Sequence, residues 1–376
     1  MRRRGKPREE RMKVAVFYGG KSCEHEVSIA TGVQIMNAAA GYEILPVYVG
    51  RDGKWLSPKK ATEISSYRSG AIKAKPCYVK AGDPAIYVGR RRTAIDAAII
   101  CNHGYGGEDG CLQGILESAG IAYTGCGVAA SAIGMDKRLS RRAFKDSGLK
   151  ITEGFAVNRD RFSNDLRGVA DETAKLGYPV IVKPASLGSS IGVGVAHDLA
   201  EFLDLLSAAF RWDNAAVIER ALPEPTELNC AVIGDEKCAE ASLSERPLSA
   251  GEILGYADKY ARGGFKGKGS GRKFPADIPE ELAEKVREQA KIAFRAVGAS
   301  GIARVDFLYS GGELYVNEIN TVPGSLALYL FPEYRYGGLT GGAAVIAKLV
   351  AIAKENKRAR DGLSYRYSDP IYGSKI

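Results

Sequence analysis

The sequence has little of what a disulfide or zinc scaffold requires. Its 376 residues include only three histidines, and none of its seven cysteines forms a Cys-x-x-Cys pair. An odd number of scattered cysteines does not make a disulfide framework, and a structural zinc site needs closely spaced cysteines and histidines. We therefore expect free, mostly buried thiols.

Long hydrophobic runs are also missing. The best candidate, residues 342–353, is interrupted by Lys348, whereas a membrane span needs about 20 apolar residues. The first residues are basic and lack the apolar stretch of a secretory signal. These observations predict a soluble, cytoplasmic protein with no membrane partner.

The composition is that of a folded protein, with 45% hydrophobic and 26% charged residues. The length predicts two or three domains. The net charge is +9, and a basic balance is typical of proteins that bind nucleic acid or a phosphate-rich small ligand. No nucleic-acid-binding module is recognisable, so we expect no nucleic-acid partner. Residues 1–11 are predicted to be a disordered basic tail.

The first part of the chain alternates strand and helix patterns. Strands are predicted at 13–18, 43–49 and 94–101, with a helix at 27–39 and a tight turn at Asp52-Gly53. The last strand leads into a glycine-rich loop, residues 102–110. This alternation predicts a parallel α/β domain over residues 12–124, with functional loops at the carboxyl ends of its strands.

The pattern changes near residue 125. Residues 125–219 are predicted to form a smaller α+β domain, with a helix at 128–147, a second helix ending at residue 175, a third at 199–209, and strands at 154–157, 179–183 and 216–219. A third domain is predicted over residues 220–376, with strands at 228–233, 302–308 and 313–318 and a long helix at 280–297. The glycine-rich, basic stretch 257–273 is predicted to be a lid loop.

One candidate phosphate site follows a predicted buried strand. Lys183-Pro184 ends the strand, and Gly188-Ser189-Ser190 follows in a turn rich in backbone N–H groups. Such turns form anion-binding concavities. The segment is not a P-loop, because Gly-x-x-x-x-Gly-Lys-Ser/Thr is missing. A surface hairpin with a solvated lysine is the alternative.

A more specific pattern lies on the last two predicted strands. Arg304 and Asp306 lie two residues apart on one strand, and Glu318 and Asn320 lie two apart at the end of the next. Strand residues two apart share a face, so the two acids and the asparagine converge if these strands pair. Hard oxygen ligands of this kind suit Mg²⁺. The alternative, a surface salt-bridge ladder, fits less well with the apolar residues that flank these positions.

Several ordered motifs together resemble the D-alanine–D-alanine ligases of the ATP-grasp superfamily. The matching segments cover roughly residues 13–350. They are Gly-Gly-Lys-Ser-Cys-Glu-His-Glu-Val-Ser (19–28), His-Gly-Tyr-Gly-Gly-Glu-Asp-Gly (103–110), Tyr-Thr-Gly (123–125), Met-Asp-Lys (135–137), Lys-Pro-Ala-Ser-Leu-Gly-Ser-Ser (183–190), Asp-Lys-Tyr (258–260), Ala-Arg-Val-Asp (303–306) and Asn-Glu-Ile-Asn-Thr-Val-Pro-Gly (317–324).

The resemblance implies an ATP-grasp fold, in which an N-terminal α/β domain precedes two domains that hold ATP between them. It also implies the reaction ATP + 2 D-alanine → D-alanyl-D-alanine + ADP + phosphate, through an acyl phosphate, for peptidoglycan precursor synthesis. The implied nucleotide-binding residues are Lys137, Lys183, Glu219, Arg220, Leu222, Glu227 and Lys259. Two Mg²⁺ (or Mn²⁺) ions would be held by Asp306, Glu318 and Asn320.

The resemblance further assigns residues to the two amino-acid substrates. The implied catalytic residues are Glu24, Ser189, Tyr260, Arg304 and Gly324, and the implied substrate contacts are His103, Ser190, Ser325 and Leu330. Glu24 would face the ammonium of the first substrate, and the Arg304 side chain and the Gly324 N–H would stabilise the tetrahedral oxyanion. A homodimer is expected.

The chain departs from the family pattern at three places. The hinge through Glu227 is about one residue longer than the common spacing, and the lid carries a basic insert at 262–273. Many members have a serine where this chain has Tyr329, and Ser325 is expected to replace it. A D-alanine–D-serine ligase stays open as the alternative, whereas Tyr260 disfavours a D-lactate enzyme. A non-catalytic nucleotide- or nucleic-acid-binding protein is disfavoured by the intact metal-ligand set.

Overall fold

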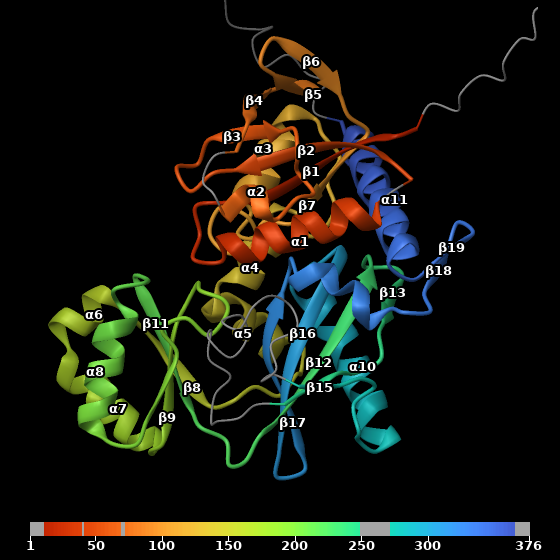
Figure 1. Cartoon of the computed structure of the whole chain (residues 1–376). Helices are drawn as coiled ribbons and strands as arrows, with labels where there is room; N and C mark the ends of the chain where they lie inside the picture. The colour runs from red at the N-terminus through yellow and green to blue at the C-terminus, as the bar shows by residue number, and fades with distance from the viewer. Residues whose placement is uncertain (1–10, 40, 69–71, 249–270, 365–376) are drawn as a thin grey trace, which may run out of the picture.

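The computed structural model describes residues 11–39, 41–68, 72–248 and 271–364. Within these ranges the strands form a seven-stranded sheet, two four-stranded sheets and two short two-stranded pairs. The seven-stranded sheet lies at the top of Figure 1, and the two four-stranded sheets lie below it on either side. Tyr260, Lys259 and most of the predicted lid lie outside the described residues, as does nearly all of the basic tail.

The N-terminal sheet has the order β6-β5-β4-β3-β2-β1-β7. β1 (Lys13–Gly19) pairs in parallel with β2 (Glu43–Val49) and with β7 (Ala97–Ile100), which confirms the parallel arrangement for these three strands. β3 (Trp55–Pro58) returns antiparallel after the turn at Asp52-Gly53, as predicted. β4 (Ala74–Lys80), β5 (Asp83–Val88) and β6 (Arg91–Ala94) continue antiparallel. The sheet is therefore mixed rather than wholly parallel, because hairpins join its last strands.

The core of this sheet includes residues from the far end of the chain. α1 (His25–Ala38) packs on β1 and α3 (Cys111–Ala119) packs on β4, while the one-turn α2 (Ser65–Arg68) lies between β3 and β4 in the sequence. The 3-10 segment η1 (Gly324–Leu330) and α11 (Gly341–Asp361) bury Leu326, Leu330, Val345 and Leu349 in the same hydrophobic cluster as β1 and β7. Figure 1 shows α11 beside the N-terminal sheet. The sequence pattern did not reveal this, because pairing of distant segments leaves no local signal.

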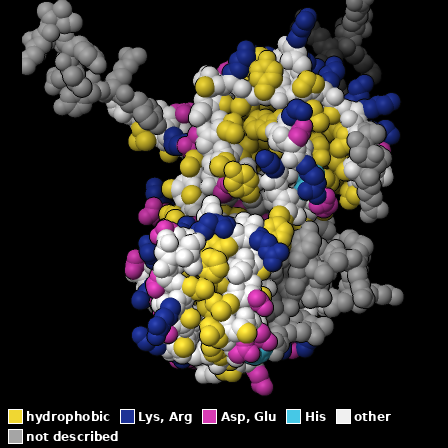
Figure 2. All heavy atoms as spheres, turned by 90° about the vertical axis from the view of Figure 1, so that its left-hand side faces the viewer, with side chains coloured by type: hydrophobic (Ala, Val, Ile, Leu, Met, Phe, Trp, Pro, Cys, Tyr) yellow, Lys and Arg dark blue, Asp and Glu magenta, His cyan; other side chains and the backbone are white. Residues whose placement is uncertain are grey.

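The second sheet has the order β10-β9-β11-β8. Its strands are β8 (Gly154–Asn158), β9 (Val180–Pro184), β10 (Gly194–Ala196) and β11 (Ala215–Arg220), with α6 (Arg159–Asn164), α7 (Leu166–Leu176) and α8 (Leu199–Ala209). Val169, Phe202 and Leu206 of the helices join Val180 and Val182 of β9 in one buried cluster. Figure 2 faces this side of the molecule, where hydrophobic side chains are interspersed with charged ones.

The third sheet has the order β13-β12-β16-β17. Its strands are β12 (Thr226–Gly234), β13 (Ala239–Ala241), β16 (Gly301–Ser310) and β17 (Glu313–Asn320), and α10 (Glu280–Ala296) covers one face. α10 buries Leu282, Val286, Ala290 and Ala293, which confirms the predicted helical spacing. Two short pairs complete the fold, namely β14 (Arg246–Pro247) with β15 (Arg272–Lys273) and β18 (Arg335–Tyr336) with β19 (Leu339–Thr340).

The helix predicted over residues 128–147 is two helices. α4 (Val128–Met135) ends before Asp136, whose backbone is extended (φ −90°, ψ 108°), and α5 (Lys137–Asp146) begins immediately after it. The Asp136 side chain accepts a hydrogen bond from the Arg138 N–H and caps the new helix. The break places Lys137 at a helix N-terminus, next to the second sheet.

In the described ranges, no helix combines the length and the apolar character that a bilayer crossing demands.

Candidate active site

Four of the predicted residues lie on one face of the β16–β17 ladder. Asp306 is directly opposite Glu318, and Arg304 is directly opposite Asn320. Directly opposed residues share a face of an antiparallel pair, so the predicted convergence of these side chains is confirmed. Arg304 donates twice to Asp306, from Nε to Oδ1 at 2.6 Å and from Nη2 to Oδ2 at 2.7 Å, and the Asn320 amide donates to Asp306 Oδ2 at 3.0 Å.

A register shift on β17 adds a residue that the sequence analysis missed. Phe307 pairs with Val316 while Asp306 pairs with Glu318, so Asn317 has no partner on β16. A bulge of this kind redirects a side chain. The Asn317 Oδ1 accepts from Lys183 Nζ at 2.9 Å. The bulge thus connects the third sheet to β9 of the second sheet, and no alternation rule predicts it.

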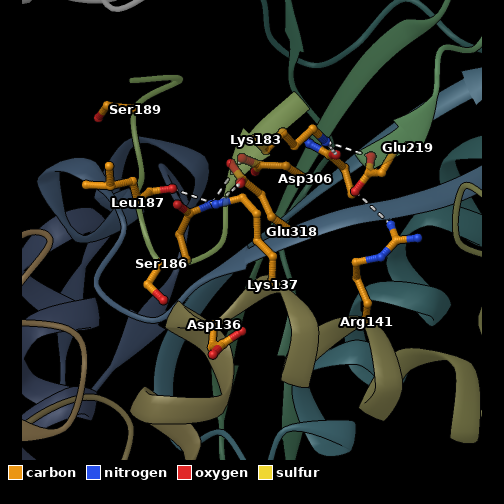
Figure 3. Close-up of polar contacts among 12 residues, drawn as sticks. Asp136, Lys137, Arg141, Lys183, Ser186, Leu187, Ser189, Glu219, Asp306 and Glu318 are labelled. Carbon is orange, nitrogen blue, oxygen red and sulfur yellow. Dashed lines mark hydrogen bonds and ion pairs between the residues drawn. The ribbon is translucent and has the colours of Figure 1, made fainter. Parts of the chain in front are cut away.

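Lys183 belongs to a buried charge network in the second sheet. Lys183 Nζ lies 2.8 Å from Glu219 Oε2, and Arg141 Nη1 lies 2.8 Å from Glu219 Oε1 (Figure 3). Arg141 also donates to the carbonyl of Thr152 at 2.6 Å. Glu219 is almost completely buried. Burial alone would raise the pKa of its carboxyl, but the Lys183 and Arg141 cations hold that pKa below the ordinary value of 4.5.

Lys137 links the first turn of α5 to the glycine-rich turn after β9. Its Nζ donates to the Leu187 carbonyl at 2.5 Å and lies 3.7 Å from Glu318 Oε2 (Figure 3). The Lys137 backbone N–H also donates to the Ala185 carbonyl at 2.9 Å. The break at Asp136 therefore brings a second cation to the acidic face of β16 and β17.

Glu24 meets the same turn from the N-terminal sheet. The Ser189 hydroxyl donates to Glu24 Oε1. A Cβ added at Gly188 would lie 3.1 Å from Glu24 Oε2, and one added at Gly104 would lie 2.9 Å from the same oxygen. A side chain at either position would crowd this carboxylate, so the two glycines let two loops approach it closely. Ser189 and Ser190 have φ values of 53° and 57°, a left-handed conformation that costs free energy in non-glycine residues.

Glu24 is 7% exposed, and its surroundings are acidic. Burial raises the pKa of Glu24 above its ordinary value of 4.5, and the nearby charge of Glu108 raises it further, while His103 and the Ser189 hydrogen bond oppose this rise. His103 Nε2 is hydrogen-bonded to Thr31 Oγ1 at 2.9 Å. A cation placed at Glu24 would favour the ionised form of its carboxyl and so lower this pKa.

The remaining predicted residues have the following positions. Glu219 and Arg220 end β11, and the Arg220 guanidinium donates to the Leu176 carbonyl at 2.9 Å. Leu222 lies in the connection to β12, where Glu227 is opposite Leu308. Gly324 begins η1, and Leu330 ends it with its side chain in the N-terminal core.

The segment after Gly324 differs from regular structure. Ser325, Leu326 and Ala327 have φ values of 53°, 48° and 50°. The Ser325 N–H donates to Thr31 Oγ1 at 3.2 Å, and its hydroxyl donates to Gln34 Oε1 at 2.5 Å. These contacts hold the left-handed turn against α1. The substrate contact expected for Ser325 stays a prediction.

A second cluster that the sequence analysis missed surrounds Tyr329. The Tyr329 hydroxyl donates to Glu245 Oε1 at 3.0 Å, and Arg272 Nη1 lies 3.2 Å from Glu245 Oε2. The Arg272 guanidinium carbon also lies 4.6 Å from the centre of the Tyr329 ring. No local motif announces this cluster, because its three residues come from three separate segments.

The donor chemistry of the β16–β17 face fits Mg²⁺. Asp306, Glu318 and Asn320 lie on one face of this ladder and carry carboxylate and amide oxygens. No group of three or more His, Cys, Asp and Glu side chains with metal-binding geometry occurs in the described ranges. Any ion here would therefore need the Asn320 oxygen and non-protein ligands, as Mg²⁺ commonly does.

Comparison with known proteins places this geometry in a family. A family model described as the D-ala D-ala ligase N-terminus matches residues 13–126, and one described as the D-ala D-ala ligase C-terminus matches residues 143–350. The chain belongs to the D-alanine–D-alanine ligase family. It is 31% identical to a D-alanine–D-alanine ligase of Thermosipho africanus, over 97% of this chain and 99% of that protein. It is 34% identical to that of Chlorobaculum tepidum, over 92% and 97%.

Solved structures agree with this family assignment and with the ATP-grasp fold. A D-alanine-D-alanine ligase from Coxiella burnetii superposes with a TM-score of 0.78 at 26% identity, covering 94% of this chain and 96% of that chain. The VanG D-Ala:D-Ser ligase from Enterococcus faecalis superposes with a TM-score of 0.75, also at 26% identity, covering 91% and 99%. The family resemblance expected from the sequence motifs is confirmed.

Proposed function

We propose that this protein is an ATP-dependent D-alanine–D-alanine ligase that makes D-alanyl-D-alanine, ADP and phosphate for peptidoglycan precursor synthesis. The observation that carries this proposal is the meeting of three elements. Lys137 lies beside Glu318, which is opposite Asp306, and Lys183 contacts Asn317 on the same strand as Glu318. Glu24 contacts the adjacent turn through Ser189. Phosphoryl transfer needs cations around the phosphates, and ligation needs an acid that positions an amine-bearing substrate.

ATP would bind between the second and third sheets. Lys137 and Lys183 would contact its phosphates, and the chain from Glu219 through Leu222 would line the adenine, with Glu227 at the ribose. We assign Arg220 and Lys259 to the same nucleotide site. Two Mg²⁺ or Mn²⁺ ions would be held by Asp306, Glu318 and Asn320, where they would neutralise phosphate charge. The proposed domains are residues 12–124, 125–219 and 220–376.

The first D-alanine would place its ammonium at Glu24. The Ser189 hydrogen bond and Tyr260 would close the site over it, with His103 and Ser190 nearby. Its carboxylate oxygen attacks the γ-phosphate of ATP, which forms an acyl phosphate and releases ADP. Exclusion of water by this closure protects the acyl phosphate from hydrolysis.

The second D-alanine then completes the reaction. Its amine attacks the acyl carbonyl carbon, a C–N bond forms, the C–O bond to phosphate breaks, and the amine loses a proton. Arg304 and the Gly324 N–H would stabilise the oxyanion of this step, and Ser325 and Leu330 are proposed to border the second substrate. We expect a cytoplasmic homodimer. D-Serine is the alternative second substrate, and the similarity to a D-Ala:D-Ser ligase favours testing it.

A direct test measures phosphate release from ATP with Mg²⁺ and either D-alanine or L-alanine, together with chromatographic detection of the dipeptide. We expect release and dipeptide with D-alanine only. A parallel reaction with equimolar D-alanine and D-serine shows which dipeptide forms. Phosphate release that does not depend on any D-amino acid would contradict the proposed function.

A further inference from the structure

The second D-amino acid, whose amine accepts the acyl group, is called the acceptor below. The part of the site proposed for it has an unusual arrangement around Tyr329. Buried Glu245 is held in place by a bridge to β12, in which Asn229 N–H donates to the Glu245 carbonyl at 2.8 Å and the Glu245 N–H donates back at 2.9 Å. Its Oε1 accepts from the Tyr329 hydroxyl and, at 3.4 Å, from the Asn229 amide, and its Oε2 pairs with Arg272. A buried carboxylate needs such partners, so this arrangement is fixed rather than incidental.

The hydrogen bond to Glu245 decides what Tyr329 can offer a substrate. A phenol has one proton to donate, and Tyr329 donates it to Glu245. Its oxygen therefore presents only lone pairs, and the Glu245 charge lies directly behind it. A substrate carboxylate placed against this hydroxyl would be repelled, so Tyr329 cannot act as a donor to the second amino acid.

Arg304 is also committed elsewhere. Its Nε and Nη2 donate to the two oxygens of Asp306, and its proposed role is at the oxyanion. Glu245 is bridged to Asn229 on β12, and Asn229 lies directly opposite Asp306 on β16, so the Tyr329–Glu245 pair adjoins the reacting centre. An acceptor carboxylate at this place needs a different cation.

Arg272 meets that need. It uses Nη1 for Glu245, its guanidinium carbon lies over the Tyr329 ring at 4.6 Å from the ring centre, and its side chain is 45% exposed. Stacking and one ion pair fix its orientation, while its other nitrogens remain geometrically available as donors. In the described part of the chain, Glu245 is the one carboxylate with which Arg272 forms an ion pair.

We propose that Arg272 binds the carboxylate of the second D-amino acid, and that Glu245 and Tyr329 act as positioning residues that aim it. This inference rests on the proposed ligase function. It assigns acceptor specificity to an acid–arginine–tyrosine cluster in place of a single hydroxyl donor.

An internal competition between two acceptors tests the inference. D-Alaninamide has the reacting amine but no carboxylate, so it can serve only as the second substrate. Equal concentrations of D-alanine and D-alaninamide compete for the same acyl phosphate. The ratio of D-alanyl-D-alanine to D-alanyl-D-alaninamide then reports only how the enzyme recognises the acceptor carboxylate, whatever the amount of active protein.

We expect the wild-type enzyme to favour D-alanine, and Arg272→Gln to lower the product ratio by about tenfold or more, as expected for loss of a hydrogen bond to a charged group. Arg272→Lys, which keeps the charge, should retain part of the preference. Arg246→Gln is the matched control. Arg246 lies on β14, which pairs with β15, and its guanidinium forms an ion pair with Asp277 at 3.1 Å. The product ratio of the Arg246→Gln variant should therefore match that of the wild-type enzyme.

Tyr329→Phe separates the two candidate anchors. The phenylalanine ring keeps the stacking surface for Arg272, so this variant should change the ratio by less than Arg272→Gln does. An unchanged ratio in Arg272→Gln, or a larger fall in Tyr329→Phe, would overturn the inference while leaving the ligase function intact. Absence of any dipeptide with the wild-type enzyme would instead refute the proposed function itself.

Discussion

The two sides of the candidate site are built differently. The phosphate side is carried by neighbouring strands, where Asp306 and Glu318 are opposed on β16 and β17 and Lys183 faces Glu219 across β9 and β11. The amino-acid side is assembled from loops that are far apart in the sequence, as in the pairs Glu24–Ser189 and Tyr329–Glu245. Strand geometry fixes the first set, whereas tertiary contacts fix the second. We therefore expect substitutions on the strand side to have larger effects.

The largest effect is expected at Glu318. Glu318→Gln should lower turnover by on the order of a thousandfold, because a charged metal ligand becomes neutral, while the thermal unfolding midpoint changes little. The measurement is steady-state phosphate release at saturating ATP and Mg²⁺. Glu313→Gln on the same strand is the control, since Glu313 forms a half-exposed pair with Lys150. Near-normal turnover of Glu318→Gln would contradict the role of Glu318 as a metal ligand. It would also contradict the expectation that substitutions on the strands have larger effects than substitutions in the loops.

Lys183→Met should affect both stability and nucleotide binding. It removes one of the two cations that compensate buried Glu219, which should cost about 3 kcal/mol of unfolding free energy. Lys150→Met, which breaks an exposed pair with Glu313, should cost less than about 1 kcal/mol. Urea denaturation measures both. Equal losses in the two variants would show that the Lys183–Glu219 pair is no more important than a surface pair.

The same network predicts a pH dependence. The pKa of Glu219 is lowered in the folded protein relative to its ordinary value of 4.5. A lowered folded-state pKa contributes stability above the unfolded-state pKa, and that stability is lost as the pH falls below about 4.5. Comparison of wild type with Glu219→Gln in urea titrations from neutral to acid pH measures this contribution. If the free energy of unfolding of the wild type falls no more steeply with decreasing pH than that of the variant, this contribution of Glu219 is refuted.

A smaller effect is expected on the loop side, at Ser189. Ser189→Ala should raise the KM of the first D-alanine by about tenfold, because the hydrogen bond to the Glu24 carboxylate is lost. That hydrogen bond also lowers the raised pKa of Glu24. The acid limb of the pH profile of kcat/KM should therefore move to higher pH in the variant. Ser186→Ala in the same turn is the control, and identical profiles for the two variants would refute a role for Ser189.

The smallest effect concerns the left-handed turn in η1. Ala327 has a φ of 50°, which glycine adopts without strain. Ala347→Gly in the middle of α11 should cost about 1 kcal/mol, whereas Ala327→Gly should cost less than half of that. Thermal unfolding of both variants measures the difference. If Ala327→Gly proves the more destabilising of the two, packing of its buried methyl group outweighs the backbone strain.

The sequence alone was sufficient for the strand-borne half of the site. Alternation places Arg304 with Asp306 and Glu318 with Asn320, and flanking apolar residues indicate burial, so pairing of two adjacent strands was enough to bring them together. The same local rules predicted the turn at Asp52-Gly53 and the buried face of α10. They failed at Asp136, where a side-chain cap divides one predicted helix into two, and at the Asn317 bulge.

Only the tertiary structure decided the loop-borne half. Ser189 reaches Glu24 across 165 positions of sequence, and Tyr329 reaches Glu245 across 84. α11 and η1 complete the N-terminal core from the opposite end of the chain. Periodicity reports only neighbours within a strand or helix, because it arises from backbone geometry repeated over a few residues. Contacts between distant segments depend instead on how whole elements pack. Local sequence therefore determined which functional side chains the strands carry, and tertiary packing determined which loop residues lie opposite them.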